Sequence, residues 1–229
     1  MMKTEEKTLF AIGNREIDEK LGGGVSIGSL LLTEGQSDAG KSVLALHLLC
    51  GALREGFHGV YYAMEHTVKS LIKAAESLGM SMEDYFLLDR VRIYPITLRM
   101  GSGGVEEYFD VLLEHFAALP ERFRFITVDS ITHLITHSDD TTIIDFFSKC
   151  KDLCDDGYTI NLVTHSYSFD EQMFVRVRAL CDGHLRLRLE EAGERLVKAL
   201  EVLKIQNAER RTGNVIMFDI EPNMGMRPI

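Results

Sequence analysis

The chain has 229 residues, of which 45% are hydrophobic, and both figures suit a single α/β domain over residues 1–229 with a sizeable core. Lysine and arginine total 25, while aspartate and glutamate total 35, so the formal net charge is −10. This balance argues against a protein built mainly to bind nucleic acid or anionic lipid, because both are strongly negative. The four cysteines show no CxxC pair or zinc-like spacing, so we expect reduced, mostly buried thiols in a cytosolic protein.

Direct membrane insertion is not expected from this sequence. The first ten residues include acids and lack an apolar core, so they do not resemble a secretory signal. No run approaches the roughly 18 consecutive apolar residues that a membrane-spanning helix needs. Any association with a membrane is therefore expected to depend on a partner protein.

A phosphate-binding motif lies near the start of the chain. Residues 35–42 read GQSDAGKS and match GxxxxGK(S/T) in full. The run 28–34 before them predicts a buried strand, and the run 43–55 after them predicts a helix. The motif therefore stands in the strand, loop and helix context that it requires.

The residue types of this loop suit a triphosphate. Glycines at Gly35 and Gly40 let successive backbone N–H groups point inward at an anion, and the positive end of the following helix adds to that field. Lys41 is expected to reach the β and γ phosphates, and Ser42 to bind a Mg²⁺ ion that also contacts the nucleotide. The residues assigned to the nucleotide are Gly35, Gln36, Ser37, Asp38, Ala39, Gly40, Lys41, Ser42 and Val43.

Strands and helices alternate beyond this loop. Further strands are predicted at 59–65, 91–96, 124–129 and 159–165. Helices are predicted at 67–80, 105–119 and 142–157, with Thr67 as an N-cap and Gly157 as a helix end. The alternation predicts a mainly parallel sheet with helices on both faces and ligand chemistry at the carboxyl ends of the strands.

The last third of the chain has a different pattern, with three strand-like runs that follow one another across short turns. These runs are 184–190, 196–206 and 214–220. They predict an antiparallel C-terminal ribbon joined to the parallel sheet.

Polar side chains at strand ends provide the remaining site candidates. Asp129 ends a predicted strand and suits a Walker B acid that orients magnesium-bound water, although it also suits a cap of the turn at Ser130. Glu65 ends the neighbouring strand and suits a general base for the attacking water, or simply an exposed glutamate before a helix. His165 suits a hydrogen bond to the γ phosphate or to a backbone carbonyl, and the sequence leaves both open.

Several segments resemble the RecA and KaiC superfamily of P-loop ATPases. Residues 13–42 contain an Ile-Asp, a GGG run, a Gly-Ser, an apolar strand and then the phosphate loop. The similarity continues through 61–67, 125–132 and 204–229, so it covers nearly the whole chain. The single-domain length, the lone Glu65 and the C-terminal sequence are most similar to the accessory proteins of the archaeal flagellum, or archaellum.

The resemblance implies a RecA-like fold that binds ATP at residues 35–42 and Mg²⁺ through Ser42 and Asp129. It also implies a homo-oligomeric ring, expected to be a hexamer, with nucleotide at the subunit interfaces. The ring is expected beside the archaellum motor ATPase and the membrane platform protein, on the cytoplasmic side of the membrane.

Two departures from the active superfamily pattern predict slow or absent hydrolysis. Active KaiC-type sites carry paired glutamates, whereas here Glu65 is followed by His66. The family commonly offers a Lys-x-Arg finger to the neighbouring subunit, but Lys204 has no arginine two positions later, and Arg210 or Arg211 would have to substitute. Because a missing arginine finger lowers the rate by about 10³ to 10⁵, we predict a nucleotide-gated assembly factor.

Other functions remain open from the sequence. Autophosphorylation is one, because Thr67 lies two residues beyond Glu65. A recombinase-like, DNA-dependent ATPase is another, because segment 165–180 occupies the position of a DNA-contacting loop and carries Arg176 and Arg178. A KaiC-like signalling ATPase would differ mainly in its partner.

Overall fold

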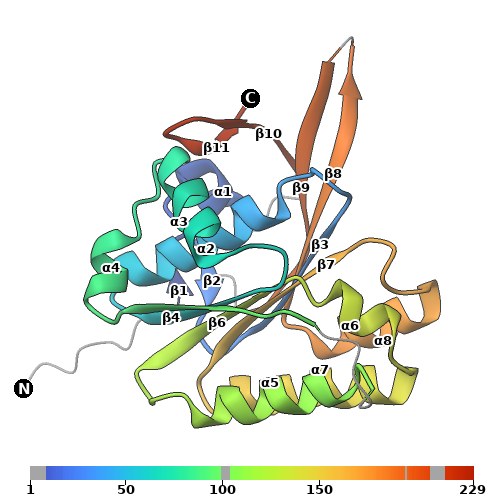
Figure 1. Ribbon diagram of the computed structural model, residues 1–229. Helices are drawn as coiled ribbons and strands as arrows, with labels where there is room; N and C mark the ends of the chain where they lie inside the picture. Colours follow the sequence, from blue (N-terminus) through green and yellow to red (C-terminus); the bar gives the residue numbers. More distant parts are fainter. Residues whose placement is uncertain (1–8, 99–103, 194, 207–214) are drawn as a thin grey trace, which may run out of the picture.

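The computed structural model describes residues 9–98, 104–193, 195–206 and 215–229, and its centre is a nine-stranded sheet (Figure 1). The strands of this sheet are β3 (Leu30–Gly35), β4 (His58–Ala63), β5 (Val91–Pro95), β6 (Phe123–Asp129), β7 (Thr159–His165), β8 (Gly183–Ala192), β9 (Arg195–Ile205), β10 (Val215–Glu221) and β11 (Gly225–Pro228). They lie in the order β11-β10-β9-β8-β3-β7-β6-β4-β5. A separate two-stranded sheet pairs β1 (Leu9–Phe10) with β2 (Val25–Ser26).

The sheet changes from parallel to antiparallel at β8. Strands β5, β4, β6, β7, β3 and β8 pair in parallel, whereas β8, β9, β10 and β11 pair antiparallel to one another. Parallel neighbours need long crossovers, and helices supply them here, while the last strands follow one another directly. The predicted parallel sheet with a C-terminal antiparallel ribbon is therefore confirmed.

Helices cover both faces of the sheet. They are α1 (Arg15–Lys20), α2 (Lys41–Arg54), α3 (Val68–Ser77), α4 (Glu83–Leu87), α5 (Glu107–Ala118), α6 (Thr132–Thr136), α7 (Asp140–Asp155) and α8 (Glu171–Leu180). In Figure 1, α1, α2 and α3 lie above the sheet, while α5 and α7 lie below it. None of the described helices is long and apolar enough to cross a membrane.

Two hydrophobic cores result from the alternation of side chains along the strands. In β3, Leu31 belongs to the core under α2, while Leu30 and Leu32 belong to the core on the other face. Tyr61 and Tyr62 divide in the same way in β4. Because successive strand residues point to opposite faces, continuous apolar runs such as that of β3 are buried on both sides.

Local signals explain where α3 begins and ends. Thr67 is its N-cap, as predicted, and its hydroxyl accepts a hydrogen bond from the N–H of Ser70 at 3.2 Å. The helix ends at Ser77, three residues before the predicted end. Gly79 has a φ of +73°, a left-handed conformation that ends helices and favours glycine.

Candidate nucleotide site

The phosphate loop joins the carboxyl end of β3 to the start of α2. Gly35 is the last residue of β3, and a Cβ atom there would collide with the backbone of Leu187 in β8. Gly40 has a φ of +99°, in the left-handed region where side chains are strained. Both motif glycines are thus required by the backbone path of the loop.

The N-terminus of α2 offers an anion-binding site. Gly40 is the N-cap, and no side chain of the described residues caps this helix. The first backbone N–H groups of a helix have no partner within it, and the helix dipole makes this end positive. A phosphate group would satisfy both features, so the residues present fit the nucleotide that the motif predicts.

Lys41 is the cation of this site. It is buried, and its Nζ donates to the carbonyl of Gln36 at 2.7 Å and lies 3.5 Å from Nδ1 of His165. Burial lowers the pKa of Lys41, while the negative charges of Asp129 and Glu65 act in the opposite direction. No carboxylate of the described residues forms an ion pair with Lys41, which leaves its charge available to an anionic ligand.

Asp129 lies beside the loop at the end of β6. Its carboxylate is buried and accepts hydrogen bonds from Tyr61 Oη, at 2.5 Å, and from the hydroxyl of Ser42. Burial raises the pKa of Asp129, and these two hydrogen bonds lower it. A cis peptide bond follows, between Asp129 and Ser130. The paired hydroxyl and carboxylate are hard oxygen donors of the kind that Mg²⁺ takes, so the donor set fits the predicted metal.

Glu65 lies two residues beyond the end of its strand. The prediction that the strand reaches Glu65 is wrong, because β4 ends at Ala63, opposite the last residue of β6, Asp129. Glu65 still faces the site, and its Oε1 accepts a hydrogen bond from Ser130 Oγ at 3.0 Å.

These side chains line one pocket of about 330 Å³. Its lining residues are Ser37, Asp38, Gly40, Lys41, Ser42, Val43, Glu65, His66, Asp129, Ser130, His165 and Ile220. Of the loop residues assigned from the sequence, Gly35, Gln36 and Ala39 do not line it, although Gln36 holds Lys41 through its carbonyl. The structure thus brings Asp129 at the end of β6, His165 at the end of β7 and Glu65, two residues beyond β4, to the phosphate loop.

A family model described as "ATPase: KaiC" matches residues 11–227, which is almost the whole chain. The chain belongs to the KaiC family of ATPases. The archaeal flagellar ATP-binding protein FlaH of Sulfolobus acidocaldarius is 26% identical over 224 residues, covering 96% of both chains. The predicted resemblance to an archaellum accessory protein of this superfamily is therefore confirmed.

A solved structure supports the same fold. The crystal structure of the flagellar accessory protein FlaH from Methanocaldococcus jannaschii superposes with a TM-score of 0.84 at 23% identity, covering 98% of this chain and 99% of that one. A more local likeness links the chain to the DNA repair protein RadA of Escherichia coli, which is 35% identical over 94 residues. That alignment covers 41% of this chain and 20% of RadA.

A row of hydroxyl groups leads from Glu65 into the protein, and the KaiC-family motifs did not reveal it. Ser130 Oγ lies 3.3 Å from Thr132 Oγ1, which lies 3.4 Å from Thr164 Oγ1. Thr164 in turn donates to Ser168 at 2.7 Å. All four hydroxyl residues are buried, and Ser130 links the row to the Glu65 carboxylate.

The C-terminal hairpin of this KaiC-family chain contributes one wall of the pocket. Ile220 of β10 lines the pocket beside Gly40. The following strand is fixed to α2 because His47 Nε2 accepts a hydrogen bond from the N–H of Met226 at 3.0 Å. Burial lowers the pKa of His47 to about 4, so the ring is neutral in the folded protein at neutral pH.

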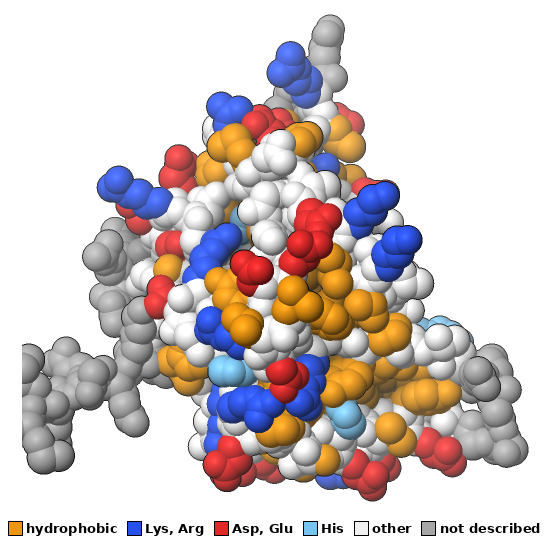
Figure 2. Space-filling view, turned by 60° about the vertical axis from the view of Figure 1, so that its left-hand side comes forward, with side chains coloured by type: hydrophobic (Ala, Val, Ile, Leu, Met, Phe, Trp, Pro, Cys, Tyr) orange, Lys and Arg blue, Asp and Glu red, His pale blue; other side chains and the backbone are white. Residues whose placement is uncertain are grey.

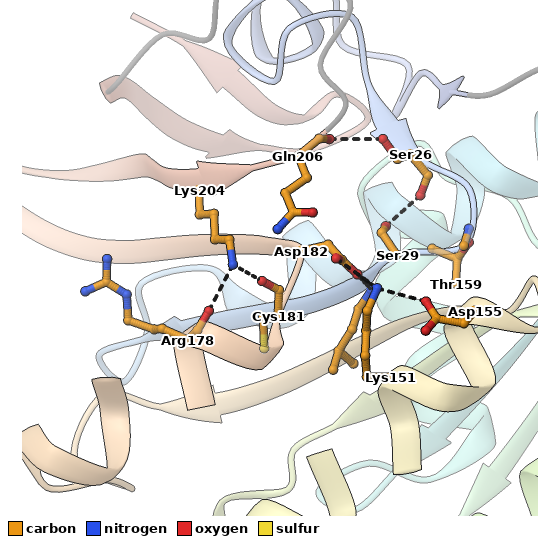
Figure 3. Close-up of polar contacts among 12 residues, drawn as sticks. Ser26, Ser29, Lys151, Asp155, Thr159, Arg178, Cys181, Asp182, Lys204 and Gln206 are labelled. Carbon is orange, nitrogen blue, oxygen red and sulfur yellow. Dashed lines mark hydrogen bonds and ion pairs between the residues drawn. The ribbon is translucent and has the colours of Figure 1, made fainter. Parts of the chain in front are cut away.

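Lys204, where the resemblance predicts a finger toward the neighbouring subunit, has partners within its own chain. Its Nζ donates to the carbonyls of Arg178, at 3.2 Å, and of Cys181, at the C-terminus of α8 (Figure 3). A lysine there satisfies helix carbonyls and complements the helix dipole. A contact from Lys204 to a neighbouring subunit stays a prediction, and Arg210 and Arg211 lie outside the described residues.

Proposed function

We propose that this chain is an ATP-binding accessory component of the archaellum. ATP and Mg²⁺ bind at the phosphate loop, stabilise a homo-oligomeric ring, taken to be a hexamer, and allow the ring to dock on the motor ATPase and the membrane platform protein. The observation that carries this proposal is the uncapped N-terminus of α2 with Lys41 beside it. The similarity to FlaH supports the archaellum as the setting. In this proposal the chain acts in the cytoplasm and is held at the membrane by its partners.

Each side chain of the pocket has a role in this proposal. Lys41 exchanges the Gln36 carbonyl for phosphate oxygens, which are the stronger partners because they are charged. Ser42 and Asp129 hold Mg²⁺, which supplies charge neutralisation to the phosphates when bound. Glu65 serves as general base for an attacking water, and His165 contacts the γ phosphate.

Slow hydrolysis is part of the proposal. Among the described residues that line the pocket there is no arginine, and Glu65 is the single glutamate. Lys204 caps α8 instead of reaching out from the surface. Without an arginine finger the charge of the phosphoryl group is less well stabilised in the transition state, so hydrolysis is slow and ATP stays bound long enough to gate assembly.

Two alternatives have less support. Autophosphorylation at Thr67 requires a hydroxyl that α3 uses as its N-cap and that does not line the pocket. DNA binding by segment 165–180 requires free arginines, but Arg176 pairs with Asp140 at 3.4 Å and Arg178 lies over the ring of Phe174. The local similarity to RadA covers less than half of the chain.

Light scattering with and without Mg·ATP tests the proposed function. We expect the mass to rise to a single discrete oligomer when Mg·ATP is added, and the motor ATPase to bind that oligomer more tightly than the nucleotide-free chain. Turnover should stay below about one per second, under the range common for enzymes. A monomeric mass at saturating Mg·ATP, or rapid hydrolysis, would contradict the proposal.

A further inference from the structure

Bulky apolar side chains are exposed at the end of α4. Phe86, Leu87 and Leu88 are consecutive in sequence, with 43%, 80% and 70% of their surfaces exposed. We call these three residues the α4 patch. The other large hydrophobic residues exposed in the described chain are single in sequence, such as Val111 and Val175. Figure 2 turns the α4 side of the molecule forward and shows hydrophobic side chains gathered in the middle of this face.

Other side chains hold α4 in place, and Leu87 and Leu88 are mostly exposed. Met82 is fully buried and Tyr85 packs against the core, and these two residues anchor the short helix. Asp89, with a φ of +50°, then turns the chain into β5. Large contiguous apolar surfaces are uncommon on monomers and mark contacts with other molecules. The side chains of the patch are therefore free to make an external contact.

Unpaired carboxylates border the α4 patch on one side. Glu76 at the end of α3 and Glu83 and Asp84 at the start of α4 are exposed, and none of them forms an ion pair within the described part of the chain. A hydrogen bond from Glu76 raises the pKa of Glu83, as expected for two carboxyl groups that share a small space. In Figure 2 acidic side chains lie directly beside the hydrophobic area.

The opposite border holds two arginines against one carboxylate. Asp89 accepts hydrogen bonds from Arg92 Nε at 2.7 Å and from Arg122. These guanidinium groups lower the pKa of Asp89 to about 2. The carboxylates beside the patch that form no ion pair within the described part of the chain lie on the Glu76 side, whereas the Arg92 and Arg122 side carries one surplus positive charge. The cations of a complementary ligand therefore belong on the Glu76 side.

We propose that the α4 patch binds a segment of another protein that presents lysine or arginine next to bulky apolar side chains. The apolar side chains of the segment cover Leu87 and Leu88, and its cations pair with Glu76 and Glu83. An amphipathic helix meets both requirements with one face. The surface lies beside β5, the outermost strand of the sheet, and shares no residue with the nucleotide pocket.

Calorimetry with two synthetic helical peptides tests the chemistry of the patch on the full chain. One peptide consists of leucine and lysine, and the other has glutamate in place of every lysine. We expect the lysine peptide to bind, and the double variant Leu87→Ser/Leu88→Ser to lose at least about tenfold in affinity, as truncation of a central apolar contact does. The matched variant Val111→Ser/Val175→Ser removes exposed apolar side chains elsewhere and should bind as the parent does.

A second double variant tests whether the carboxylates beside the patch contribute to binding. Glu76→Gln/Glu83→Gln should weaken the lysine peptide several-fold and reduce the dependence of binding on salt, because exposed charges are screened. Equal affinity of the patch variant and the parent, or equal binding of the two peptides, would overturn the inference. So would a change in oligomeric mass of the patch variant, since the patch would then face a second copy of this chain.

The motor ATPase provides a test with a natural protein, and this arm alone rests on the proposed function. A loss of at least about tenfold in its affinity for the patch variant, but not for the matched variant, would support the inference. If parent and patch variant bind the motor ATPase equally, the patch assignment fails while the proposed partner stands. If neither binds it, the proposed partner fails, and the peptide result still decides on the patch.

Discussion

Both edges of the parallel sheet hold buried polar groups, but the two edges differ in whether the charged groups have partners of opposite charge. At the amino edge, Lys151 binds both carboxylate oxygens of Asp182, at 3.0 and 2.9 Å, and also pairs with Asp155 (Figure 3). At the carboxyl edge, the polar partners of Lys41 among the described residues are a carbonyl and a histidine, and no described side chain caps the N-terminus of α2. At the amino edge the charged groups are paired with one another and stabilise the fold. At the carboxyl edge the donors lack an anionic partner among the described residues, as expected for a ligand-binding site. We call these the closed edge and the open edge.

The largest predicted change in stability comes from the closed edge. Lys151→Met leaves Asp182 buried without its cation, while Asp182 Oδ2 still accepts from the N–H of Leu30. We expect the free energy of unfolding to fall by about 3 kcal/mol, because the buried carboxylate of Asp182 loses the partly exposed cation that compensates its charge. Urea denaturation measures it, and the affinity for ATP should not change. A stability loss no larger than that of Lys73→Met, on the exposed face of α3, would contradict this assignment.

A second prediction concerns the pH dependence of stability and the buried hydrogen bond of His47 to Met226. Its pKa is about 4 in the folded chain and near 6.5 when unfolded, so the unfolded state binds the extra proton between these values. Stability should therefore fall as the pH drops from 6.5 to 4, by about 3 kcal/mol from this residue, and level off below. Denaturation midpoints of the parent and of His47→Gln across this range isolate the contribution. Parallel pH profiles for the two proteins would show that His47 does not carry it.

At the open edge, Asp129→Asn should change binding rather than folding. The amide keeps the shape of the side chain but removes the charge that Mg²⁺ needs, so the benefit of Mg²⁺ to ATP affinity should shrink about tenfold. Calorimetry with ATP in magnesium and in EDTA measures this difference. The melting temperature should stay the same or rise, because burial raises the pKa of Asp129 and makes its charge costly. An unchanged magnesium effect would exclude Asp129 as a ligand.

The smallest effect is expected from the hydroxyl row behind Glu65. Ser130→Ala removes the donor to Glu65 Oε1 and should lower whatever turnover exists by about threefold, since one neutral hydrogen bond positions the carboxylate. Ser130→Thr keeps the hydroxyl and should restore turnover. Equal turnover of Ser130→Ala and the parent would show that this hydrogen bond does not position Glu65.

Local sequence signals predicted most of the parallel sheet and the phosphate loop. The run before Gly35, the GK(S/T) motif and the cap at Thr67 each act over a few residues, so they can be recognised without the fold. The position of β7 at 159–165 was predicted to the residue for the same reason. The ligand edge then followed from the alternation of strands and helices.

Contacts between distant residues could not be predicted in this way. Lys204 caps α8 because β9 passes next to Cys181 in the fold. The sequence around Lys204 contains no signal for this contact with a helix end 23 residues away. The hydroxyl row combines residues of two segments, 130–132 and 164–168, and neither segment shows a recognisable motif for such a row. The helix α8 was missed although Asp170 accepts from the N–H of Met173 at 2.8 Å as its N-cap, because segment 165–180 was interpreted as a ligand-contacting loop.

Calorimetric titration of Mg·ATP into the parent, Lys41→Ala and the surface control Lys73→Ala tests the central claim most directly. We predict that Lys41→Ala loses at least about a hundredfold in affinity while it unfolds at the same urea concentration as the parent, and that Lys73→Ala binds normally. Lys41→Ala with the same Kd as the parent would show that the open edge of the sheet is not the nucleotide site.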